Sequence, residues 1–233
     1  MVPQKRSITN MNTKLLLIDF DGTICAVHHS VIHCIFHTYQ KFNLPRVPDD
    51  ETIKIILGSG VVIESMFKKL LSHSDINYSD KDLSEMCQYY RKFYASSSIN
   101  EIKLYKNFDH ILKVIKNKHL TSIIISNKEQ ERLLSATKYL NINHLVDHII
   151  GTDDTVKAKP HQDMFNRKVQ PLCSNLDLDN ILIVGDTNSD IQFAKNCGFK
   201  SCFARYGYGN DNLAETADYV IDSPTELLSL VYA

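Results

Sequence analysis

From Leu104 onward, short apolar segments alternate with segments of helical periodicity, and this order constrains the fold more than any other feature of the chain. The apolar segments, in which β-branched residues are frequent, are residues 121–126, 148–150, 181–184, 201–204 and 219–221. The segments of helical periodicity are residues 107–118, 128–140, 161–172, 189–197 and 224–231. Strands that alternate with helices form a parallel sheet with helices on both faces, connected by right-handed crossovers. The sequence therefore predicts an α/β fold.

A helical segment interrupts this pattern near the N-terminus. The apolar strand at residues 14–19 is soon followed by amphipathic stripes at residues 31–42, 61–71 and 83–94, which predict the core of a small helical bundle. A bundle beside the ligand-binding edge of a sheet can act as a lid that excludes water. We therefore predict a catalytic core at residues 14–26 and 103–233, an inserted helical cap at 27–102, and a flexible N-terminus at 1–13.

The composition of the chain argues against several classes of function. A formal net charge of −1 over 233 residues gives no electrostatic reason to expect nucleic acid or an anionic membrane as a partner. No apolar run approaches the roughly 20 residues that span a bilayer, and the polar N-terminus lacks the apolar segment of a secretory signal. The six cysteines include no Cys-x-x-Cys pair, which favours reduced thiols over a zinc site. We therefore expect a cytoplasmic protein.

Two carboxylates lie where the first strand is predicted to end. Asp19 and Asp21 follow the apolar residues 15–18, and Gly22 gives the backbone freedom to turn directly afterwards. Residues i and i+2 of a strand share a face, so both acids can point into one site. Like charges this close repel each other, and such pairs are usually kept for metal binding or for chemistry that needs two acids. Alone, the motif is equally compatible with an acidic turn.

Polar residues also lie at the ends of later strands. Ser126 ends the second predicted strand, and Asp186 follows another apolar strand after one glycine. Ligands of parallel sheets bind beyond the carboxyl ends of the strands, so we expect both residues to meet Asp19 in one crevice. The carboxylates of this group, with that of Asp190, offer oxygen ligands for Mg²⁺, and Lys159 adds an ammonium. The lysine and the hydroxyl beside such a metal suit a phosphate group.

Three of these residues also have a simpler interpretation. Ser126 is compatible with a cap of the helix predicted at 128–140. Lys159 stands in the same polar loop as Lys157, and most loop lysines are solvated. Asp190 can stabilise the N-terminus of its own helix through the helix dipole. The joint presence of all the motifs, rather than any one residue, favours a site.

The four motifs, in this order, resemble those of the haloacid dehalogenase superfamily of phosphohydrolases. Asp19-Phe20-Asp21-Gly22-Thr23 matches the first motif of the family, and residues 185–190 match its last, Gly-Asp-x-x-x-Asp. Ser126 and the Lys159-Pro160 pair stand at the positions between them, and the helical insert lies where the family has its type-one cap. The Lys-Pro pair and residues 206–209 (Tyr-Gly-Tyr-Gly) look closest to the phosphoglycolate phosphatase branch. The resemblance implies a Rossmann-like core.

The resemblance also implies a role for each matched residue. Asp19 would be the nucleophile that forms an aspartyl-phosphate, and Asp21 would protonate the leaving oxygen and then act as base for the hydrolytic water. Lys159 would offset charge on the phosphoryl group and on Asp19. The implied Mg²⁺ ligands are Asp19, the backbone carbonyl of Asp21, Asp186 and Asp190. The implied substrate-binding residues are Thr23, Ser126, the backbone of Asn127, and Lys159.

The resulting prediction is a Mg²⁺-dependent phosphatase that hydrolyses a small phosphomonoester of the phosphoglycolate kind, as a monomer or a homodimer. A phosphomutase of the β-phosphoglucomutase type, a pyrophosphatase and a nucleotidase share the implied fold and stay open as alternatives. Alternatives of other classes are a phospho-accepting receiver domain and a non-catalytic binding protein. The helical insert after the first strand argues against a receiver, and the presence of every expected catalytic residue argues against a silent binding protein.

Overall fold

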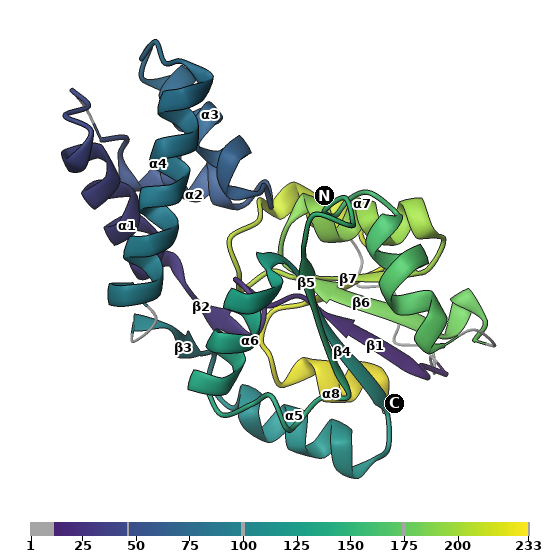
Figure 1. Ribbon diagram of the computed structural model, residues 1–233. Helices are drawn as coiled ribbons and strands as arrows, with labels where there is room; N and C mark the ends of the chain where they lie inside the picture. Colours follow the sequence, from purple (N-terminus) through teal and green to yellow (C-terminus); the bar gives the residue numbers. More distant parts are fainter. Residues whose placement is uncertain (1–11, 46, 99–100, 174–175, 233) are drawn as a thin grey trace.

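The computed structural model describes residues 12–45, 47–98, 101–173 and 176–232 of the chain. Its centre is a six-stranded sheet in the order β5-β4-β1-β6-β7-β8 (Figure 1). The strands are β1 (Leu15–Ile18), β4 (Thr121–Glu129), β5 (His148–Thr152), β6 (Ile181–Gly185), β7 (Lys200–Ala204) and β8 (Tyr219–Ile221). All neighbouring strands of this sheet pair in parallel. The α/β fold predicted from the alternation of strands and helices is thus confirmed.

Helices cover both faces of this sheet. They are α5 (Phe108–Asn117), α6 (Gln130–Tyr139), α7 (Asn188–Cys197) and α8 (Glu226–Val231). On β1, Leu16 and Ile18 belong to the apolar layer shared with α5, α6 and α8, whereas Leu15 and Leu17 belong to the layer shared with α7. The two-residue period of a strand produces this division. Because both faces are covered, β1 is buried along its whole length.

The end of β4 differs from the sequence prediction. The strand continues through Lys128 to Glu129, where the periodicity predicted a helix, and α6 begins at Gln130. The pairing register between β4 and β5 shifts between Ile125 and Glu129, so the last residues of β4 leave the regular ladder. An irregularity of this kind redirects side chains at the end of a strand. It brings polar residues to the edge of the sheet where the apolar strand stops.

The helix predicted at residues 161–172 is confirmed in part, because residues 163–172 are helical but do not form one regular α-helix. The structure has a turn there, followed by a π-helix, η3 (Phe165–Val169), and a 3₁₀-helix, η4 (Gln170–Leu172). Pro171 has no N–H to donate, so a regular α-helix cannot continue through it. Two further 3₁₀-helices are η5 (Leu178–Asn180) and η6 (Asp211–Glu215).

The insert forms a helical group beside the sheet (Figure 1, purple to blue). Its helices are α1 (His28–Lys41), α2 (Asp50–Leu57), α3 (Ile63–His73) and α4 (Asp80–Phe93), which continues into a π-helical turn, η1 (Tyr94–Ser98). The predicted stripes of α1, α3 and α4 meet in one apolar core that includes Ile35, Phe67 and Met86. The periodicity did not single out α2, whose N-cap is Asp49. The Asp49 side chain accepts the Thr52 N–H at 2.8 Å. In the described ranges, no helix is long and apolar enough to cross a membrane.

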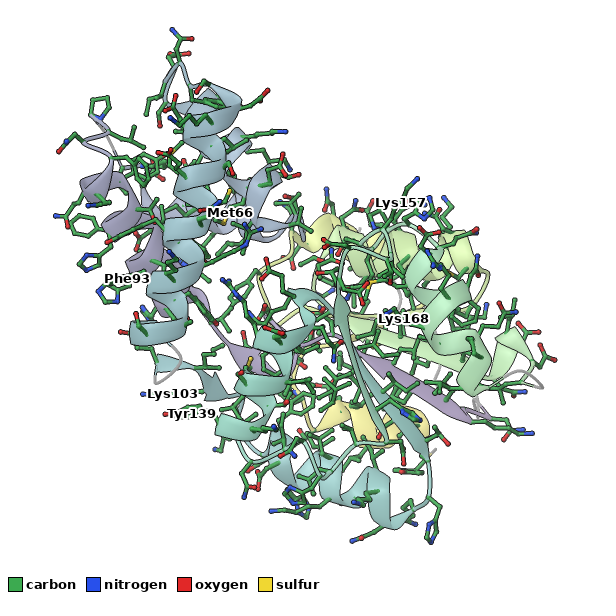
Figure 2. All side chains as sticks on the ribbon, in the orientation of Figure 1. Met66, Phe93, Lys103, Tyr139, Lys157 and Lys168 are labelled. Carbon is green, nitrogen blue, oxygen red and sulfur yellow. The ribbon has the colours of Figure 1, made fainter. Side chains whose placement is uncertain are left out.

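A two-stranded antiparallel sheet joins both ends of the insert to the core. Strand β2 (Cys25–Ala26) pairs with β3 (Lys103–Leu104), and Lys103 lies at this junction (Figure 2). The Tyr105 N–H donates to the Ile24 carbonyl at 3.0 Å and extends the pairing. Strands of two residues carry no readable alternation, so the sequence did not predict them. The chain therefore enters and leaves the insert at one place.

Candidate active site

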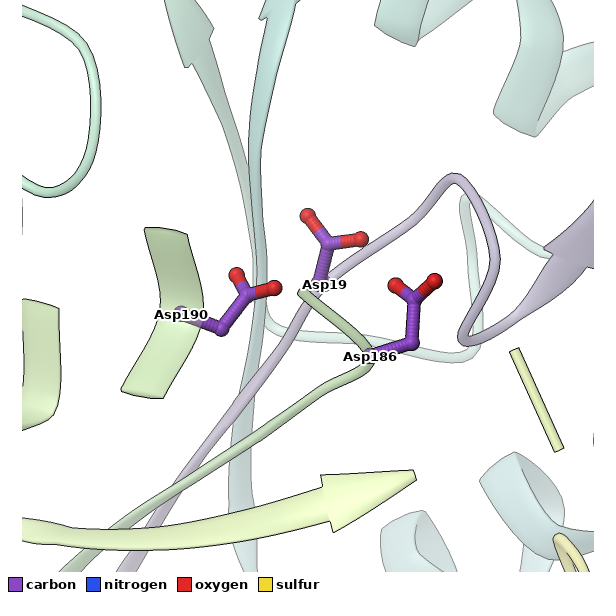
Figure 3. A group of neighbouring side chains, drawn as sticks. All are labelled: Asp19, Asp186 and Asp190. Atoms are coloured by element: carbon purple, nitrogen blue, oxygen red, sulfur yellow. The ribbon is translucent and has the colours of Figure 1, made fainter. Parts of the chain in front are cut away.

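Three carboxylates lie close together beyond the central strands (Figure 3). Asp19 follows β1, Asp186 follows β6, and Asp190 lies in the first turn of α7. One oxygen of each lies within 4.8 Å of the others, and all three residues are buried. Strands that are neighbours in the sheet but distant in sequence thus place three acids close enough to share one cation.

A buried ammonium group lies against these acids. Lys159 Nζ is 2.7 Å from Asp19 Oδ1 and 2.6 Å from Asp190 Oδ1, and it donates to the Ile125 carbonyl at 2.9 Å. Only 1% of the Lys159 side chain is exposed. The Asn127 side chain accepts the Lys159 N–H at 2.8 Å and donates to the Lys159 carbonyl at 2.9 Å. Both the backbone and the side chain of Lys159 are therefore fixed.

The charges in this cluster do not balance. Burial raises the pKa of Asp19 to about 7, although Lys159 acts in the opposite direction. Burial, with the charges of Asp19 and Asp190, raises the pKa of Asp186 well above its ordinary value. Burial acts to lower the pKa of Lys159, but the two carboxylates beside it outweigh that effect and raise it. Three carboxylates against one ammonium leave an excess of negative charge, which a divalent cation would offset.

Two loops hold the carboxylate of Asp186. Thr23 donates its hydroxyl to Asp186 Oδ1 at 3.2 Å, and the Tyr208 N–H donates to Oδ2 at 2.8 Å. Thr23 is fully buried and its hydroxyl positions Asp186, and the substrate contact predicted from the sequence stays a prediction. Gly22 has a φ of +94°, and a Cβ there would lie 2.2 Å from Asp186 Oδ2. The turn after the first acid therefore requires glycine.

Asp190 is held at both of its oxygens. Oδ1 contacts Lys159, and Oδ2 accepts from the Thr187 N–H at 3.1 Å and from the Thr187 hydroxyl at 2.7 Å. The contacts with Thr187 form a capping box at the start of α7. Asp190 thus caps the N-terminus of α7 and contacts Lys159 at the same time. By contrast, Asp19 Oδ2 has no hydrogen-bond partner among the described residues.

The second acid of the first motif has a largely buried lysine of its own. Lys128 Nζ is 2.8 Å from Asp21 Oδ2, and 11% of the Lys128 side chain is exposed. The ammonium also lies 4.9 Å from the centre of the Tyr94 ring. Burial acts to lower the pKa of Lys128, but the charge and hydrogen bond of Asp21, together with the neighbouring Tyr94 and Cys25, outweigh this and raise it. Asp21 Oδ1 is buried without a hydrogen-bond partner in the described part of the chain, so it is available for a further contact.

These groups open into a cavity of about 350 Å³ whose wall combines the core and the insert. The wall includes Asp19, Asp21, Ser126 and Lys128 from the core, and Val31, Val62, Met66 and Tyr90 from the insert. A volume of this size accommodates a small metabolite. The insert therefore supplies a large part of the surface that any ligand at the acids would touch.

The predicted phosphate-binding residues lie at the base of this cavity wall. Ser126 is 2% exposed, and its hydroxyl accepts the Lys128 N–H at 3.2 Å. It does not cap α6, because Glu129 occupies the N-cap position. Asn127 lies next to it and donates its side-chain amide to the Gly60 carbonyl in the insert at 2.9 Å. Ser126 and Asn127 thus connect the end of β4 with both the site and the insert.

The sequence did not identify Lys128 as part of the site. The periodicity assigned it to the start of a helix, where a charged residue is ordinary. Lysine is rarely buried unless it is paired, and its partner here is distant in sequence. The sequence indicated a place in the site for Lys128 only through its position. Lys128 stands two residues after Ser126, just as Asp21 stands two residues after Asp19.

Tyr208 is a second residue whose position was not predicted. The sequence left residues 206–209 undecided between an aromatic rim of the site and a flexible turn. The Tyr208 hydroxyl accepts from the N–H groups of Val27, at 2.7 Å, and His28, at 3.1 Å, while its own N–H binds Asp186. The Tyr206 hydroxyl donates to the Thr23 carbonyl at 3.0 Å. The loop therefore ties the acid after β6 to the start of α1.

Comparison with known proteins shows relatives over nearly the whole chain. The family model of the haloacid dehalogenase-like hydrolases matches residues 16–204. A phosphoglycolate phosphatase from Aquifex aeolicus is 27% identical over 223 residues, covering 94% of this chain and 96% of the relative. The pyrophosphatase PpaX from Halalkalibacterium halodurans is 23% identical over 223 residues, covering 95% and 98%.

The fold agrees with a solved structure of the same kind. A haloacid dehalogenase-like family hydrolase from Streptococcus pneumoniae superimposes with a TM-score of 0.80 at 25% identity. The match covers 94% of this chain and 98% of that protein. With the family model spanning residues 16–204, this chain belongs to the haloacid dehalogenase-like hydrolases.

Proposed function

We propose that this chain is a Mg²⁺-dependent phosphatase that hydrolyses a small phosphomonoester through an aspartyl-phosphate on Asp19. Membership of the hydrolase family and the phosphatase names of its relatives support the reaction class. The observation that carries the proposal is the buried group of Asp19, Asp186 and Asp190 with Lys159 against it. A phosphoryl group brings several negative oxygens, so a cation and an ammonium beside a carboxylate nucleophile suit its transfer.

The donor set at the site suits Mg²⁺. The ion prefers oxygen ligands and keeps several waters, and the carboxylates of Asp19, Asp186 and Asp190 would hold it together with the Asp21 backbone carbonyl. Burial raises the pKa of both Asp19 and Asp186, so a cation that stabilises their charged forms would offset this cost, which supports the assignment. When bound, the ion supplies charge neutralisation to the phosphoryl group. The hydrogen bonds from Thr23 and Tyr208 would fix the orientation of one of its ligands.

The proposed reaction has two steps. First, Asp19 Oδ2 attacks phosphorus, the bond from phosphorus to the leaving oxygen breaks, and Asp21 gives that oxygen a proton. A water molecule then attacks the phosphorus of the aspartyl-phosphate and gives a proton to Asp21, which releases inorganic phosphate and restores both acids. Lys159 holds Asp19 by the other oxygen, Oδ1, at 2.7 Å. Ser126 and the backbone of Asn127 would bind phosphoryl oxygens.

We propose further that residues 27–102 act as a cap on a core formed by residues 14–26 and 103–233. Both parts contribute to the cavity wall, and the hydrogen bond from Asn127 to Gly60 connects them at the site. A cap that closes over the acids would exclude bulk water during the first step. Among the relatives, one is named a phosphoglycolate phosphatase and another a pyrophosphatase. Both names support a small phosphorylated substrate.

Removal of Mg²⁺ is expected to abolish phosphate release. Chelation with EDTA should stop hydrolysis of p-nitrophenyl phosphate, and added MgCl₂ should restore it. The metal should also stabilise the fold by about 3 kcal/mol at a concentration 100 times its Kd, measured as a rise in Tm. Asp186→Asn should weaken both effects, whereas Asp109→Asn, which removes a surface acid of α5, should weaken neither. Full activity in EDTA would contradict the metal assignment.

The Asp21→Asn variant should lower kcat on an aryl phosphate by about 10²-fold, the smaller end of the range for general acid–base catalysis. An aryl leaving group needs little protonation, so most of this loss should fall on the attack of water. Rapid-quench measurements should therefore show phosphoenzyme accumulating in the variant. Asp153→Asn is the control, because Asp153 lies on the same cavity wall but pairs with Lys168 at 2.7 Å. A kcat within a few-fold of the wild type would rule out the proton-transfer role.

A screen of small phosphate esters tests the reaction class directly. Measured values of kcat/KM for phosphoglycolate, pyrophosphate and sugar phosphates should identify the best substrate, with free phosphate as the product. Conversion of a sugar phosphate into its isomer without phosphate release would show a phosphomutase instead. A phosphoprotein that persists for hours would support the receiver alternative.

A further inference from the structure

The cavity wall contains a second charged group besides the catalytic acids. Arg91, Glu129 and Arg132 all line the cavity that also contains Asp19 and Asp21. Building on the phosphatase function above, we propose that Arg91 and Arg132 form a second anion subsite. They select phosphate esters that carry another negatively charged group, such as a carboxylate, on the leaving side.

The geometry of this group leaves positive charge unmatched. Arg91 Nε is 2.6 Å from Glu129 Oε1, and Arg132 Nε is 3.3 Å from Glu129 Oε2. Each oxygen of the Glu129 carboxylate thus contacts one arginine, and the two guanidinium groups share a single negative charge. All three side chains keep some exposure, with 17% for Arg132 and about 40% for the other two, so a ligand in the cavity can reach them.

The unused donors of both arginines suit a second anion. Each ion pair has its contact at Nε, and among the described residues no hydrogen bond from the terminal nitrogens of either arginine occurs. A guanidinium has five donors in a planar fork that matches carboxylate and phosphate oxygens. Burial lowers the pKa of Arg132 even though the charge of Glu129 opposes this, so the group has lost more solvation than its partner replaces. An additional anion would replace the solvation that the Arg132 guanidinium has lost.

One part of the insert wall offers a ligand an apolar surface. Val31, Val62 and Met66 line the cavity and offer no hydrogen bonds. A ligand with a short apolar spacer between two charged ends would match this cavity. One end would bind at the acids and the metal, and the other end would bind at the two arginines. Arg91 lies on α4 of the insert and Arg132 on α6 of the core, so an anion held by both would also hold the insert against the core.

Binding of two phosphonates of matched shape tests the subsite. 3-Phosphonopropionate carries a carboxylate, 3-methylbutylphosphonate has two methyl groups in its place, and neither has a bond that a phosphatase hydrolyses. By isothermal titration with Mg²⁺ present, the wild type should bind the carboxylate compound at least about tenfold more tightly, as expected for charge-assisted hydrogen bonds. Arg91→Gln and Arg132→Gln should each reduce this preference to less than about threefold.

The control is Arg205→Gln, since Arg205 also contacts two carboxylates, Asp211 and Asp222, but does not line the cavity. It should keep the full preference. A wild type without preference for the carboxylate would overturn the proposal. So would arginine variants that bind both compounds equally less well, because that result indicates only a link between insert and core. Binding does not depend on turnover, so failure of the phosphatase assignment would appear separately, as the absence of phosphate release from every ester.

Discussion

Replacing Asp19 by asparagine is expected to abolish turnover in a protein that remains folded. Asparagine keeps the shape of the side chain but offers no carboxylate to attack phosphorus, so kcat should fall by at least about 10⁴-fold, as for other lost nucleophiles. Intact-protein mass spectrometry after rapid quenching should show a phosphoryl adduct on the wild type and none on the variant. The assay is phosphate release from p-nitrophenyl phosphate with saturating Mg²⁺.

The fold should tolerate this substitution. Burial raises the pKa of Asp19 to about 7, which means that the folded protein disfavours its charged form. Lys159 keeps its contact with Asp190 at 2.6 Å after the change. The Tm of the metal-free variant should therefore equal or exceed that of the wild type. Asp154→Asn, at an exposed acid on the same cavity wall, should keep its activity, and turnover by Asp19→Asn near the wild-type rate would refute the mechanism.

Lys159→Met should damage both catalysis and stability. Loss of a preorganised positive charge beside the phosphoryl group typically costs about 10²–10³ in rate. Asp19 and Asp190 would also lose their buried partner, and breaking such a pair typically costs about 3–5 kcal/mol. Urea unfolding without metal measures the second effect. Since Mg²⁺ offsets the same negative charge, adding it should restore part of the lost stability but not the rate.

Two further variants separate this charge effect from general damage. Lys157→Met changes the neighbouring lysine, which is exposed on the outer surface (Figure 2), and should alter stability by no more than about 0.5 kcal/mol. Adding Asp19→Asn to Lys159→Met should recover stability, because it removes one of the two orphaned charges. If the double variant is as unstable as the sum of its parts predicts, the loss is not electrostatic.

The fold could be predicted from the sequence because its strands are short, apolar and regularly spaced. The segment at 181–184 predicted β6 within one residue, and Gly198 marked the end of α7 by taking a left-handed φ of +85°. The meeting of Asp19 with Asp186 followed from one rule, that parallel strands present their carboxyl ends at one edge. These features depend on local pattern and on topology, both of which the sequence encodes directly.

What the sequence did not reveal depends on contacts between distant residues. Lys128 looks like a surface lysine until β4 is extended by its irregular end and Asp21 is placed beside it. Tyr208 looks like part of a flexible loop until its hydroxyl meets the N–H groups at the start of α1. The position of Thr23 in its motif says nothing about burial, so its hydrogen bond to Asp186 was not predicted. In each case the two partners lie more than 100 residues apart in the sequence, so their contact had to be known before the residue could be assigned.

The small β2–β3 sheet has a consequence for how such an enzyme diversifies. Because Ala26 and Lys103 pair across these two strands, the chain leaves the core for residues 27–102 and returns to it at one point. A different segment grafted at that point leaves the order of β4, β1 and β6 unchanged, and with it the spacing of the acids at their ends. An exchange of the helices between β2 and β3 would therefore change the part of the cavity wall that they supply and leave the acids of the core in place.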